Sequence, residues 1–496
     1  MSEENRVVVI GSGPPGATAA SRLARAGVDV LLLEAGTEAD AHGLTVRLRG
    51  VTVGKSGTEL HEREGVLKTG DPTAELFEAL APGGLSNHWS CAVPRFAPED
   101  FADAARAGVE QTWPLGYAEL APWYDSVEPL LHVAGSNADY EQLPAGRVRH
   151  LRRLGDDWTP IARRARDEGR TVVAMPYAYG DDTTFTRSGT PFNSFVRLIK
   201  PEMGRGKLSV RFGARAARLE WSTTQRRVVG VTFRDRVAGG EQRVSCRAVV
   251  VAGGALNSAQ ILLESTSADF PNGLGNQHGV VGRYLHDHPV GKVMIDVARP
   301  MTMVPPAYLT RLELARSKVP LYAAAAMQWS STKDLARSVL ARTPGKLGQL
   351  GFSVFGTMAP TRENFVALDP SFRQADGSPG LQLHVRRPPE SVVALEETRD
   401  HIMSLLAETG WEPKQSLWKL EPIGRSNHYA GTCRMHASPE YGVVDAVGRV
   451  HGVPNVIVAD SSVFTTNPEK NPVLTSMALA ARASDRLAND LKSGDL

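Results

Sequence analysis

Short runs of apolar residues alternate with glycine-rich turns at the N-terminal end of the chain. Residues 6–10 form one such run, and residues 28–33 form a second. Between them, residues 17–26 carry small and apolar side chains at helical spacing, and Gly27 follows where that helix would end. Strands that are apolar along their whole length are typical of a parallel sheet covered on both faces. The pattern therefore predicts a strand–turn–helix–strand unit.

Two further apolar runs lie much later in the chain. Residues 248–251 lead into a glycine turn, after which a helix is expected from about Ala255, and residues 455–459 form another run. We interpret the first as a later strand of the same parallel sheet and the second as one more strand. Weaker alternation at residues 321–327 and 381–385 is compatible with strands of a different sheet.

The first turn carries three glycines, Gly11, Gly13 and Gly16, at the spacing of a dinucleotide-binding motif. Gly11 permits the tight turn, Gly13 lets the backbone approach a pyrophosphate, and Gly16 lets helix and strand pack closely. The pyrophosphate would sit at the helix N-terminus, where free N–H groups and the helix dipole attract anions. The alternative is a glycine-rich turn in an unrelated α/β protein, but the strands and helix around this turn agree with the motif.

Two further features near the N-terminus fit a dinucleotide. Glu34 ends the second strand, where an acid can accept hydrogen bonds from the adenosine ribose and disfavours a 2′-phosphate, so NADP is not expected. A second glycine cluster occupies residues 82–90, where the paired Gly83 and Gly84 would let the backbone approach a flat ligand closely.

The composition limits the classes of function. A chain of 496 residues is long enough for two or three domains. Its net charge of +2 gives no field that would favour nucleic acid or an anionic membrane, and no apolar run is long enough to span a bilayer. The basic stretch at residues 147–153 is interpreted as a solvated face.

Three cysteines are scattered along the chain at Cys91, Cys246 and Cys433. Their odd number and the lack of a Cys-x-x-Cys spacing argue against a disulfide framework or a zinc site. The N-terminal residues lack the charged and apolar regions of a secretory signal. We therefore expect a cytoplasmic protein.

Two segments near the C-terminus carry candidate chemistry. Residues 426–435 read Ser-Asn-His-Tyr-Ala-Gly-Thr-Cys-Arg-Met and contain His428, and residues 467–475 read Asn-Pro-Glu-Lys-Asn-Pro-Val-Leu-Thr and contain Asn471. A histidine is a suitable base because small changes in its environment move its pKa across the neutral range. The amide of an asparagine can donate a hydrogen bond to a substrate oxygen.

With these motifs the chain resembles the glucose-methanol-choline (GMC) oxidoreductase family. The N-terminal glycine motif and residues 83–89, 113–135, 248–265, 273–289 and 428–486 fit the family in order, whereas residues 290–420 carry little of it. The segment Leu-Ser-Asn-His-Trp at residues 85–89 is similar to that of pyranose oxidases. This similarity favours the sugar and glycoside branch of the family.

The resemblance implies an α/β fold in which a Rossmann-type FAD-binding domain is interleaved with an α+β substrate domain built on an antiparallel sheet. Residues 1–165, 205–290 and 421–496 would form the FAD-binding domain, and residues 166–204 and 291–420 would form the substrate domain over the isoalloxazine ring. FAD, rather than NAD, is then the expected cofactor. The residues expected to contact it are Gly11, Gly13, Pro15, Gly16, Glu34, Ala35, Gly83, Gly84, Ser86, Asn87, His88, Ala252, Gly253, Asp460, Ser461, Pro472 and Val473.

The resemblance also assigns the catalytic pair. His428 would be the base that takes the hydroxyl proton, Asn471 would hold the developing alkoxide, and a hydride would pass to flavin N5. Each residue has a structural alternative. His428 would otherwise be a core histidine, and Asn471, followed by Pro472 and then apolar residues at helical spacing, fits a helix N-cap. The N-cap and active-site roles of Asn471 are compatible.

His88 leaves a question about how the cofactor is attached. Its counterpart in pyranose oxidases is bonded covalently to the flavin, but those proteins tend to have Thr where this chain has Asn87. Covalent attachment and non-covalent packing against the flavin both stay open.

Several chemically active side chains are assigned no chemistry. Cys433 and His436 lie close to the catalytic motif but are interpreted as structural. His286, Asp287 and His288 look like a metal cluster, yet they match a structural stretch of the family, so no metal is expected.

The expected substrate is a small-molecule alcohol, namely a sugar, a glycoside or an aminosugar. A cationic aminosugar would need carboxylates in the substrate domain, and the candidates are Asp181, Asp182, Glu363 and Asp369. The alternatives are a non-sugar alcohol such as a sterol, choline or an aryl alcohol, a flavin-containing cyanohydrin lyase, and a flavin-binding module without catalysis. Oxygen or another acceptor would reoxidise the flavin. The choice between oxidase and dehydrogenase, and the oligomeric state, stay open.

Overall fold

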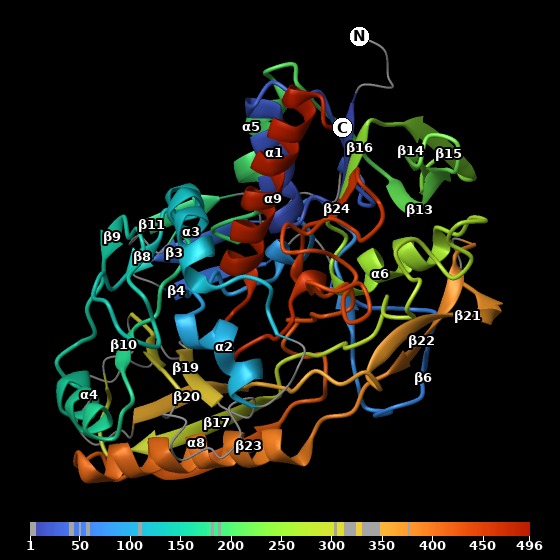
Figure 1. Ribbon diagram of the computed structural model, residues 1–496. Coiled ribbons are helices and arrows are strands. Elements are labelled where there is room, and N and C mark those ends of the chain that lie inside the picture. Colours follow the sequence, from blue (N-terminus) through green and yellow to red (C-terminus); the bar gives the residue numbers. More distant parts are fainter. Residues whose placement is uncertain are drawn as a thin grey trace.

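The structure is a computed structural model in which strands from both ends of the chain form one parallel sheet (Figure 1). It describes residues 6–38, 44–48, 51–55, 60–107, 112–179, 183–186, 190–301, 305–311, 324–329, 348–374 and 377–496. The parallel sheet has the order β12–β2–β1–β16–β24. Its strands are β1 (Val7–Ile10), β2 (Val30–Leu33), β12 (Leu208–Arg211), β16 (Ala248–Val251) and β24 (Val456–Val458).

The predicted strand–turn–helix–strand unit is confirmed. Helix α1 (Pro14–Arg25) connects β1 to β2, starts with prolines in its first turn and ends before Gly27, whose φ is +89°. The later runs at residues 248–251 and 455–459 are confirmed as β16 and β24, which pair in parallel with each other. β16 also pairs in parallel with β1, so the predicted continuation of the first sheet is confirmed.

Helices cover one face of the parallel sheet and a three-stranded meander lies on the other side (Figure 1). Helix α9 (Val473–Ser493) packs along α1, and Arg22 and Asp485 join them by an ion pair of 2.5 Å. The meander consists of β13 (Ala214–Ser222), β14 (Arg227–Asp235) and β15 (Glu241–Ser245). Coverage on both faces explains why the four residues of β1 are entirely buried.

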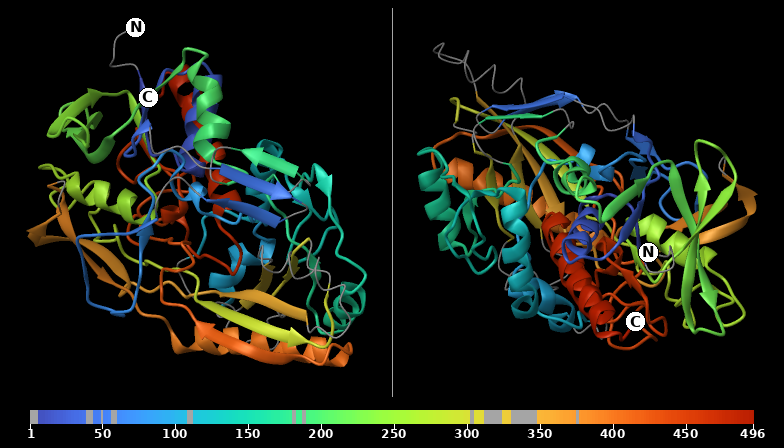
Figure 2. Two further views of the ribbon diagram at one scale, coloured as in Figure 1. Left: turned by 180° about the vertical axis from the view of Figure 1, so that it is seen from behind. Right: turned by 90° about the horizontal axis from the view of Figure 1, so that it is seen from above.

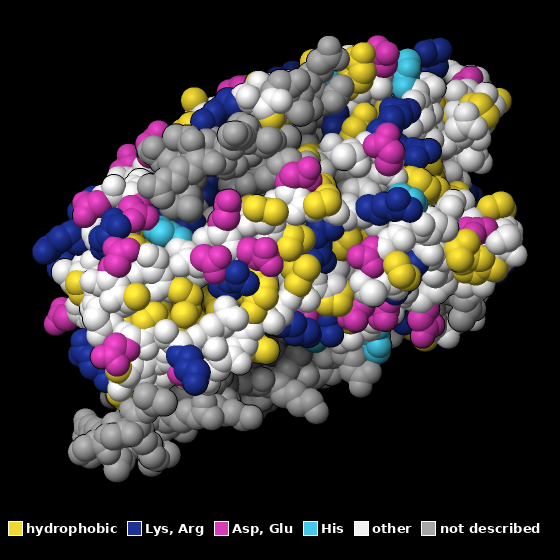
Figure 3. All heavy atoms as spheres, turned by 90° about the horizontal axis from the view of Figure 1, so that it is seen from below, with side chains coloured by type: hydrophobic (Ala, Val, Ile, Leu, Met, Phe, Trp, Pro, Cys, Tyr) yellow, Lys and Arg dark blue, Asp and Glu magenta, His cyan; other side chains and the backbone are white. Residues whose placement is uncertain are grey.

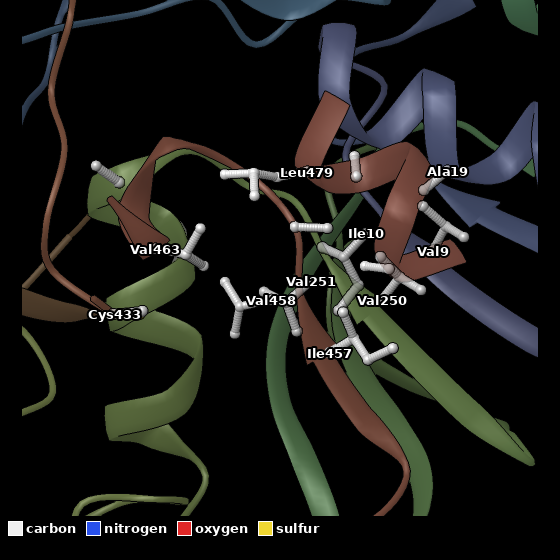
Figure 4. Close-up of a cluster of buried hydrophobic side chains, with 14 of the residues drawn as sticks. Val9, Ile10, Ala19, Val250, Val251, Cys433, Ile457, Val458, Val463 and Leu479 are labelled. Carbon is white, nitrogen blue, oxygen red and sulfur yellow. The ribbon is translucent and has the colours of Figure 1, made fainter. Parts of the chain in front are cut away.

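The core of this domain forms where β1, β16 and β24 meet the helices. Figure 4 shows Ile10, Val251 and Val458 from the three strands beside Leu479 of α9. All four side chains are buried, so the sheet and its C-terminal helix share one apolar core.

A six-stranded antiparallel sheet forms the second large layer, with the order β10–β18–β19–β20–β17–β23. Its strands are β10 (Val172–Ala174), β17 (Val290–Val297), β18 (Ala307–Leu309), β19 (Ala324–Trp329), β20 (Gly348–Gly356) and β23 (Lys414–Leu420). Helix α8 (Pro389–Glu408) runs along its outer face (Figures 1 and 2). Of the two weakly alternating segments, the described part of residues 321–327 lies in β19, and residues 381–384 lie in β22 (Pro379–His384) of another sheet.

Smaller elements complete the described structure. The remaining helices are α2 (Pro98–Arg106), α3 (Tyr117–Leu131), α4 (Trp158–Asp167), α5 (Lys200–Met203) and α6 (Ala255–Glu264), with short η3 (Gly84–Asn87), η4 (Phe195–Ile199) and η5 (Ser461–Val463). The remaining strands are β3 (Leu44–Leu48), β4 (Val51–Lys55), β5 (His61–Glu62), β6 (Val66–Lys68), β7 (Phe77–Glu78), β8 (Ala134–Gly135), β9 (His150–Leu151), β11 (Thr183–Thr186) and β21 (Phe365–Arg373). Helix α6 begins at Ala255, as the sequence predicts.

The surface mixes charges of both signs. On the face seen from below, Lys and Arg side chains are interspersed with Asp and Glu (Figure 3), in keeping with the net charge of +2. Among the described helices, none is long and apolar enough to cross a bilayer.

Candidate active site

A long cleft opens at the carboxyl edge of the parallel sheet, where the chain leaves β1, β2, β16 and β24. Ligands bind at this edge in open α/β sheets because the turns there present backbone groups and helix N-termini. The cleft is lined by residues from β1 and its glycine turn through to Ser476 in α9. Segments from both ends of the sequence therefore form one binding surface.

The three motif glycines have separate structural reasons. A Cβ at Gly11 would lie 2.5 Å from the carbonyl oxygen of Ala252, and one at Gly16 would lie 2.1 Å from the carbonyl oxygen of Gly11. At Gly13, a Cβ would meet no protein atom within 4 Å. Gly11 and Gly16 thus permit close packing, while Gly13 keeps open a space on the cleft wall where a phosphate can approach the helix N-terminus.

Three helix N-termini border the cleft. Pro14 of α1, Ala255 of α6 and Val473 of α9 all line it. Asp460, which follows β24, connects to the turn and helix that follow β16. Its Oδ2 accepts hydrogen bonds from Gly254 N at 2.9 Å and Ser258 Oγ at 2.6 Å. The helix ends give the cleft a positive potential suited to an anionic ligand.

Glu34 lies at the end of β2, buried in the wall of the cleft. Its carboxylate accepts hydrogen bonds from Gly36 N at 2.7 Å and Ser12 N at 3.1 Å, and from the hydroxyl of Ser12. Burial raises the pKa of Glu34, and these donors oppose that effect. A carboxylate has about four acceptor positions, so one stays available for a ribose hydroxyl.

The structure divides the predicted cofactor residues among three places. The cleft is lined by Gly11, Gly13, Pro15, Glu34, Ala35, Gly84, Ala252, Gly253, Asp460, Ser461, Pro472 and Val473. Ser86 and His88 line a second cavity instead, and Val473 borders both. Gly16, Gly83 and Asn87 line neither cavity and pack beneath the loops that do.

The supporting role is clearest at Gly83 and Asn87. A Cβ at Gly83 would lie 2.6 Å from Nδ2 of Asn193. The side chain of Asn193 donates to Oδ1 of Asn87 at 2.8 Å, and Nδ2 of Asn87 donates to the carbonyl oxygen of Gly84 at 2.8 Å. Gly83 N also donates to Oγ of Ser12 at 2.8 Å, which holds the glycine loop against the first turn of the parallel sheet.

One cleft residue gave no signal in the sequence. Arg63 is buried in the wall, where it donates hydrogen bonds to Asn257 Oδ1 at 2.5 Å, Gln260 Oε1 at 2.5 Å and Glu78 Oε2 at 2.8 Å. A single arginine in a polar stretch has no periodicity or motif, so only the fold identifies it.

The second cavity lies between the cleft and the six-stranded sheet. Val290 and Lys292 of β17, Met327 of β19, and Ser353 and Phe355 of β20 contribute to its wall. The two cavities share Pro14, Leu85, Asn427, His428 and Val473. A ligand bound in the cleft and a molecule bound in the second cavity would therefore meet beside His428.

His428 and Asn471 come together at this junction. Nδ2 of Asn471 lies 3.3 Å from Nε2 of His428, and both residues line the second cavity. Asn471 does not cap the helix, because α9 begins at Val473 with Pro472 in the cap position and no side-chain cap bond. The N-cap expectation is therefore wrong by one residue, since the amide of Asn471 turns to His428 instead.

The backbone of His428 is held by Asp287. Oδ1 of Asp287 accepts a hydrogen bond from His428 N at 3.0 Å and another from the hydroxyl of Ser426, and its Oδ2 accepts one from Gly424 N at 2.9 Å. The residue before the histidine, Asn427, has a φ of +58°, in the left-handed region. This sharp turn, fixed by Asp287, points the imidazole at the junction.

A second histidine, His288, contacts the ring of His428. The two Nδ1 atoms are 2.9 Å apart and the rings are nearly perpendicular, with an interplanar angle of 80°. His288 is buried, and the ring of Phe355 packs against both histidines, with its centroid 5.6 Å from that of His428 and 6.1 Å from that of His288. The sequence had indicated a structural role for the His286–Asp287–His288 stretch and had not connected it to the active site.

Burial controls the protonation of this group. One edge of His428 opens on the cavity, but protein atoms surround the rest of the ring, and this desolvation lowers its pKa well below the ordinary value. The neighbouring His288 lowers it further. Burial also raises the pKa of Asp287 to about 6, although its hydrogen bonds act in the opposite direction. His428 is thus held as a neutral imidazole, which is the form that can accept a proton.

Charged side chains form one end of the second cavity. Glu421 lies between Lys292 at 2.9 Å and Lys419 at 3.1 Å, and Arg425 pairs with Glu75 at 2.7 Å. Glu421, Lys292 and Arg425 line the cavity. Sequence reasoning missed them, since single charged residues outside a motif give no signal of where they lie in the fold.

The two described carboxylate candidates lie elsewhere. Glu363 and Asp369 do not line the described cavity wall, and Asp369 accepts hydrogen bonds from Ser371 in β21. Asp181 and Asp182 lie outside the described residues. Glu421 is therefore the carboxylate found in the described lining.

The fold and the cleft define a dinucleotide-binding protein with a histidine where the cleft meets a second cavity. Residues 102–290 and 360–480 each match a family profile described as GMC oxidoreductase, and residues 4–174 match one described as FAD binding domain. The chain belongs to the GMC oxidoreductase family, as the sequence motifs predicted. It is an FAD-dependent enzyme of this family.

Curated relatives match nearly the whole chain. The 2-methyl-1,2-propanediol dehydrogenase of Mycolicibacterium austroafricanum is 28% identical over 98% of this chain and 96% of its own length. The paromamine 6'-oxidase of Streptomyces fradiae is 29% identical over 98% of this chain and 92% of its own. Both are named for the oxidation of alcohols.

A solved structure supports the fold. Pyridoxine 4-oxidase from Mesorbium loti superimposes with a TM-score of 0.65 over 98% of this chain and 99% of its own, at 19% identity. The similarity establishes the shared α/β architecture. The open space at Gly13 and the three helix N-termini of the cleft fit FAD, whose pyrophosphate needs backbone donors and positive potential.

Proposed function

We propose that this protein oxidises a hydroxyl group of a sugar or glycoside to a carbonyl group, with His428 as the base. The observation that carries the proposal is the position of His428, which lines both the FAD cleft and the second cavity. When bound, FAD supplies the electron acceptor for the alcohol carbon. The second cavity would hold the alcohol.

Each residue of the pair has a defined task. Nε2 of His428 accepts the hydroxyl proton, for which its lowered pKa keeps it available. Nδ2 of Asn471 lies on the same side and can donate a hydrogen bond to the substrate oxygen as negative charge develops there. Two neighbouring atoms would thus remove the proton and stabilise the oxygen.

The lining of the cavity supports a sugar-like substrate. Trp89, Met327 and Phe355 provide an apolar wall, whereas Lys292 and Glu421 provide polar groups. A pyranose ring has apolar faces and a rim of hydroxyl groups, so a cavity of this mixed character matches it. Paromamine 6'-oxidase, named for an aminosugar substrate, is consistent with a glycosidic substrate.

The charges favour a neutral sugar or glycoside over a cationic aminosugar. Glu421 is held by Lys292 and Lys419, and Arg425 adds another cation to the described wall. A polycationic substrate would meet net positive charge there. A small non-sugar alcohol is the second candidate, favoured by the similarity to a diol dehydrogenase.

We infer that residues 1–165, 205–290 and 421–496 form the FAD-binding domain, with residues 166–204 and 291–420 forming the substrate domain. The free thiols of Cys91, Cys246 and Cys433 support a cytoplasmic location. Oxygen or another acceptor would reoxidise the flavin.

Covalent attachment of the flavin through His88 stays part of the proposal. His88 lies on the wall of the second cavity, close to the junction with the cleft. Burial and the nearby His61 lower the pKa of His88, so its ring is neutral and nucleophilic at neutral pH. Unfolding the protein in acid decides the question, because covalently bound flavin stays yellow on the polypeptide and free flavin separates from it.

The first test is anaerobic mixing of the purified yellow protein with neutral sugars, glycosides, aminosugars and small diols. Bleaching of the flavin band by the neutral sugars or glycosides is the expected result. Bleaching by diols alone would move the assignment to the second candidate. A cyanohydrin that is cleaved while the flavin stays oxidised would indicate a lyase, and admission of air separates oxidase from dehydrogenase.

The matched variants are His428→Ala and His436→Ala. His428→Ala should slow substrate-driven flavin reduction by roughly 10²- to 10⁴-fold while FAD stays bound. His436 is half-buried outside both cavities and accepts a hydrogen bond from Ser438 N, so its variant serves as the control. Equal reduction rates in the two variants would contradict the assignment of the base.

A further inference from the structure

His288 is buried beside His428 and lines neither cavity. It cannot reach a substrate directly, yet its Nδ1 atom lies 2.9 Å from Nδ1 of His428. The nearly perpendicular rings and the short distance fit one hydrogen bond between the two nitrogens. The bond constrains where the protons of both rings can be.

Two neutral arrangements satisfy a contact between two Nδ1 atoms. Either His428 donates from Nδ1 and keeps its Nε2 bare, or His288 donates and His428 carries its proton on Nε2. The first arrangement leaves Nε2 ready to accept a substrate proton. The second would present an N–H group to the substrate, and no proton could be taken.

Asn471 selects between the two arrangements. Its amide nitrogen, Nδ2, faces Nε2 of His428 at 3.3 Å. An amide nitrogen is a donor only, so Nε2 of His428 must be the acceptor and its proton must be on Nδ1. His428 Nδ1–H then donates to His288, and the ring proton of His288 is on Nε2.

The surroundings of His288 favour a proton on its ring. The carbonyl groups of Asn467 and Pro468, the side chain of Asn467 and the carboxylate of Glu469 lie near the ring and act to raise its pKa, although Nε2 of His288 makes no hydrogen bond of ordinary geometry with them. Burial nevertheless lowers the pKa of His288 to about 4, so the ring is neutral at neutral pH. A neutral His288 with a bare Nδ1 is the partner that the first arrangement requires.

We propose that His288 is the positioning residue of the base, and that it acts by accepting the Nδ1–H hydrogen bond of His428 and thereby keeping Nε2 bare toward the substrate. This inference rests on the proposed function of His428. In the step, the O–H bond of the substrate breaks and an N–H bond forms at Nε2 of His428. The Nδ1 proton stays in place and is shared more strongly with His288 once the ring is charged.

A neutral partner differs from a carboxylate in its effect on the base. A carboxylate on Nδ1 would raise the pKa of His428 by stabilising the charged ring at rest. His288 orients the ring and supplies an acceptor without that charge, and the carboxylate of Asp287 is hydrogen-bonded to the backbone N–H of His428 instead. The arrangement therefore fixes the tautomer while leaving the base neutral.

The direct test is nitrogen NMR of the protein labelled in its histidine rings, recorded near neutral pH on the FAD-bound enzyme and assigned with His428→Ala. We expect His428 to show a protonated Nδ1 and a bare Nε2, and His288 the reverse. A protonated Nε2 on His428, or a charged ring, would overturn the proposal. The wild-type spectrum decides this point even if a variant fails to fold.

The variants His288→Ala and His288→Asn test the consequence for catalysis. Alanine removes the acceptor, and flavin reduction should slow by about a hundredfold with little change in substrate affinity. Asparagine places Oδ1 near the position of Nδ1, so it can accept the same hydrogen bond and should recover most of the rate. Equal rates for alanine and wild type, or no rescue by asparagine in a variant with normal FAD content, would overturn the proposal.

The results separate this inference from the proposed function. If His428→Ala reduces its flavin normally, the base is misassigned and the proposed function fails. If His428→Ala is slow but His288→Ala is as fast as wild type, only the role of His288 fails.

Discussion

Burial determines the chemistry of the histidines around the active site. His286, His288 and His428 are packed among protein atoms, and desolvation is the largest cause of the lowered pKa of each. In the first two cases burial lowers the pKa to about 4. Three neutral rings within one small region carry no charge, which lets them lie close together.

This burial predicts the pH dependence of the reductive step. As the proposed base, His428 would work unprotonated, and its pKa lies well below about 6.5, the ordinary value for histidine. The rate of flavin reduction should therefore be constant from about pH 8 down to about pH 6.5, and it should fall only as the pH drops through the lowered pKa. Rapid mixing at saturating substrate measures it, with FAD content checked at each pH. A rate that declines already between about pH 8 and pH 7 would contradict a buried neutral base.

At the scale of single residues, sequence analysis identified the candidate residues that lie inside recognisable motifs. His428, Asn471 and the glycines stand in recognisable segments, and the structure brings His428 and Asn471 to the same junction. His288 is 140 residues from His428 along the chain, and nothing in the local pattern predicts that their rings meet. Glu421 and Lys292 were missed for the same reason, because their positions depend on how the antiparallel strands are placed.

At the scale of elements, a buried ionic cluster fixes the loop before α9. Lys470, next to Asn471, is fully buried and pairs with Asp100 at 2.7 Å. Arg311 is also fully buried and pairs with Asp103 at 2.6 Å and Glu99 at 2.7 Å. The cluster connects α2, the segment just after β18 and the loop that carries Asn471, so it fixes the position of Asn471.

The substitution Arg311→Met should destabilise the protein by about 3–5 kcal/mol, since it leaves buried carboxylates without their cation. The matched control is Arg147→Met, which removes an exposed pair with Asp125 and should change stability by less than about 1 kcal/mol. Denaturant unfolding of the FAD-bound protein measures both. Equal stabilities of the two variants would show that the buried cluster contributes no more than a surface pair.

Elements with strong periodicity were predictable and those dependent on long-range pairing were not. The runs that became β1, β2, β16 and β24 are apolar throughout, which is typical of central parallel strands. Strand β23, at the edge of the six-stranded sheet, gave no signal because none of its residues is buried. Its pairing with β17 joins segments more than 100 residues apart, which no local pattern indicates.

At the scale of the whole molecule, substitutions at two glycines of the motif beside the cleft can separate cofactor binding from folding. Gly16→Ala should impair folding, because its Cβ would lie 2.1 Å from a backbone oxygen. Gly13→Ala should fold normally yet hold less FAD, because its Cβ meets no protein atom and projects at the cleft. Flavin absorbance per protein and thermal melting of both variants measure the two effects.

The control for these glycine variants is Gly116→Ala, whose Cβ also meets no protein atom within 4 Å but lies outside the cleft. It should keep full FAD content and normal melting. A Gly13→Ala variant with full FAD content would contradict the position assigned to the pyrophosphate.

The strand order of the parallel sheet has a consequence for the synthesis of the protein. β1 is complete near residue 10, but β16 appears about 240 residues later and β24 about 450 residues later. A ribosome adds about 5–20 residues per second, so about 20 to 90 seconds separate the first strand from the last. During that interval the nascent chain must shelter a wholly apolar strand that has β2 on one side but still lacks β16 on the other. Flavin can be captured, and the base assembled, only once the chain is nearly complete.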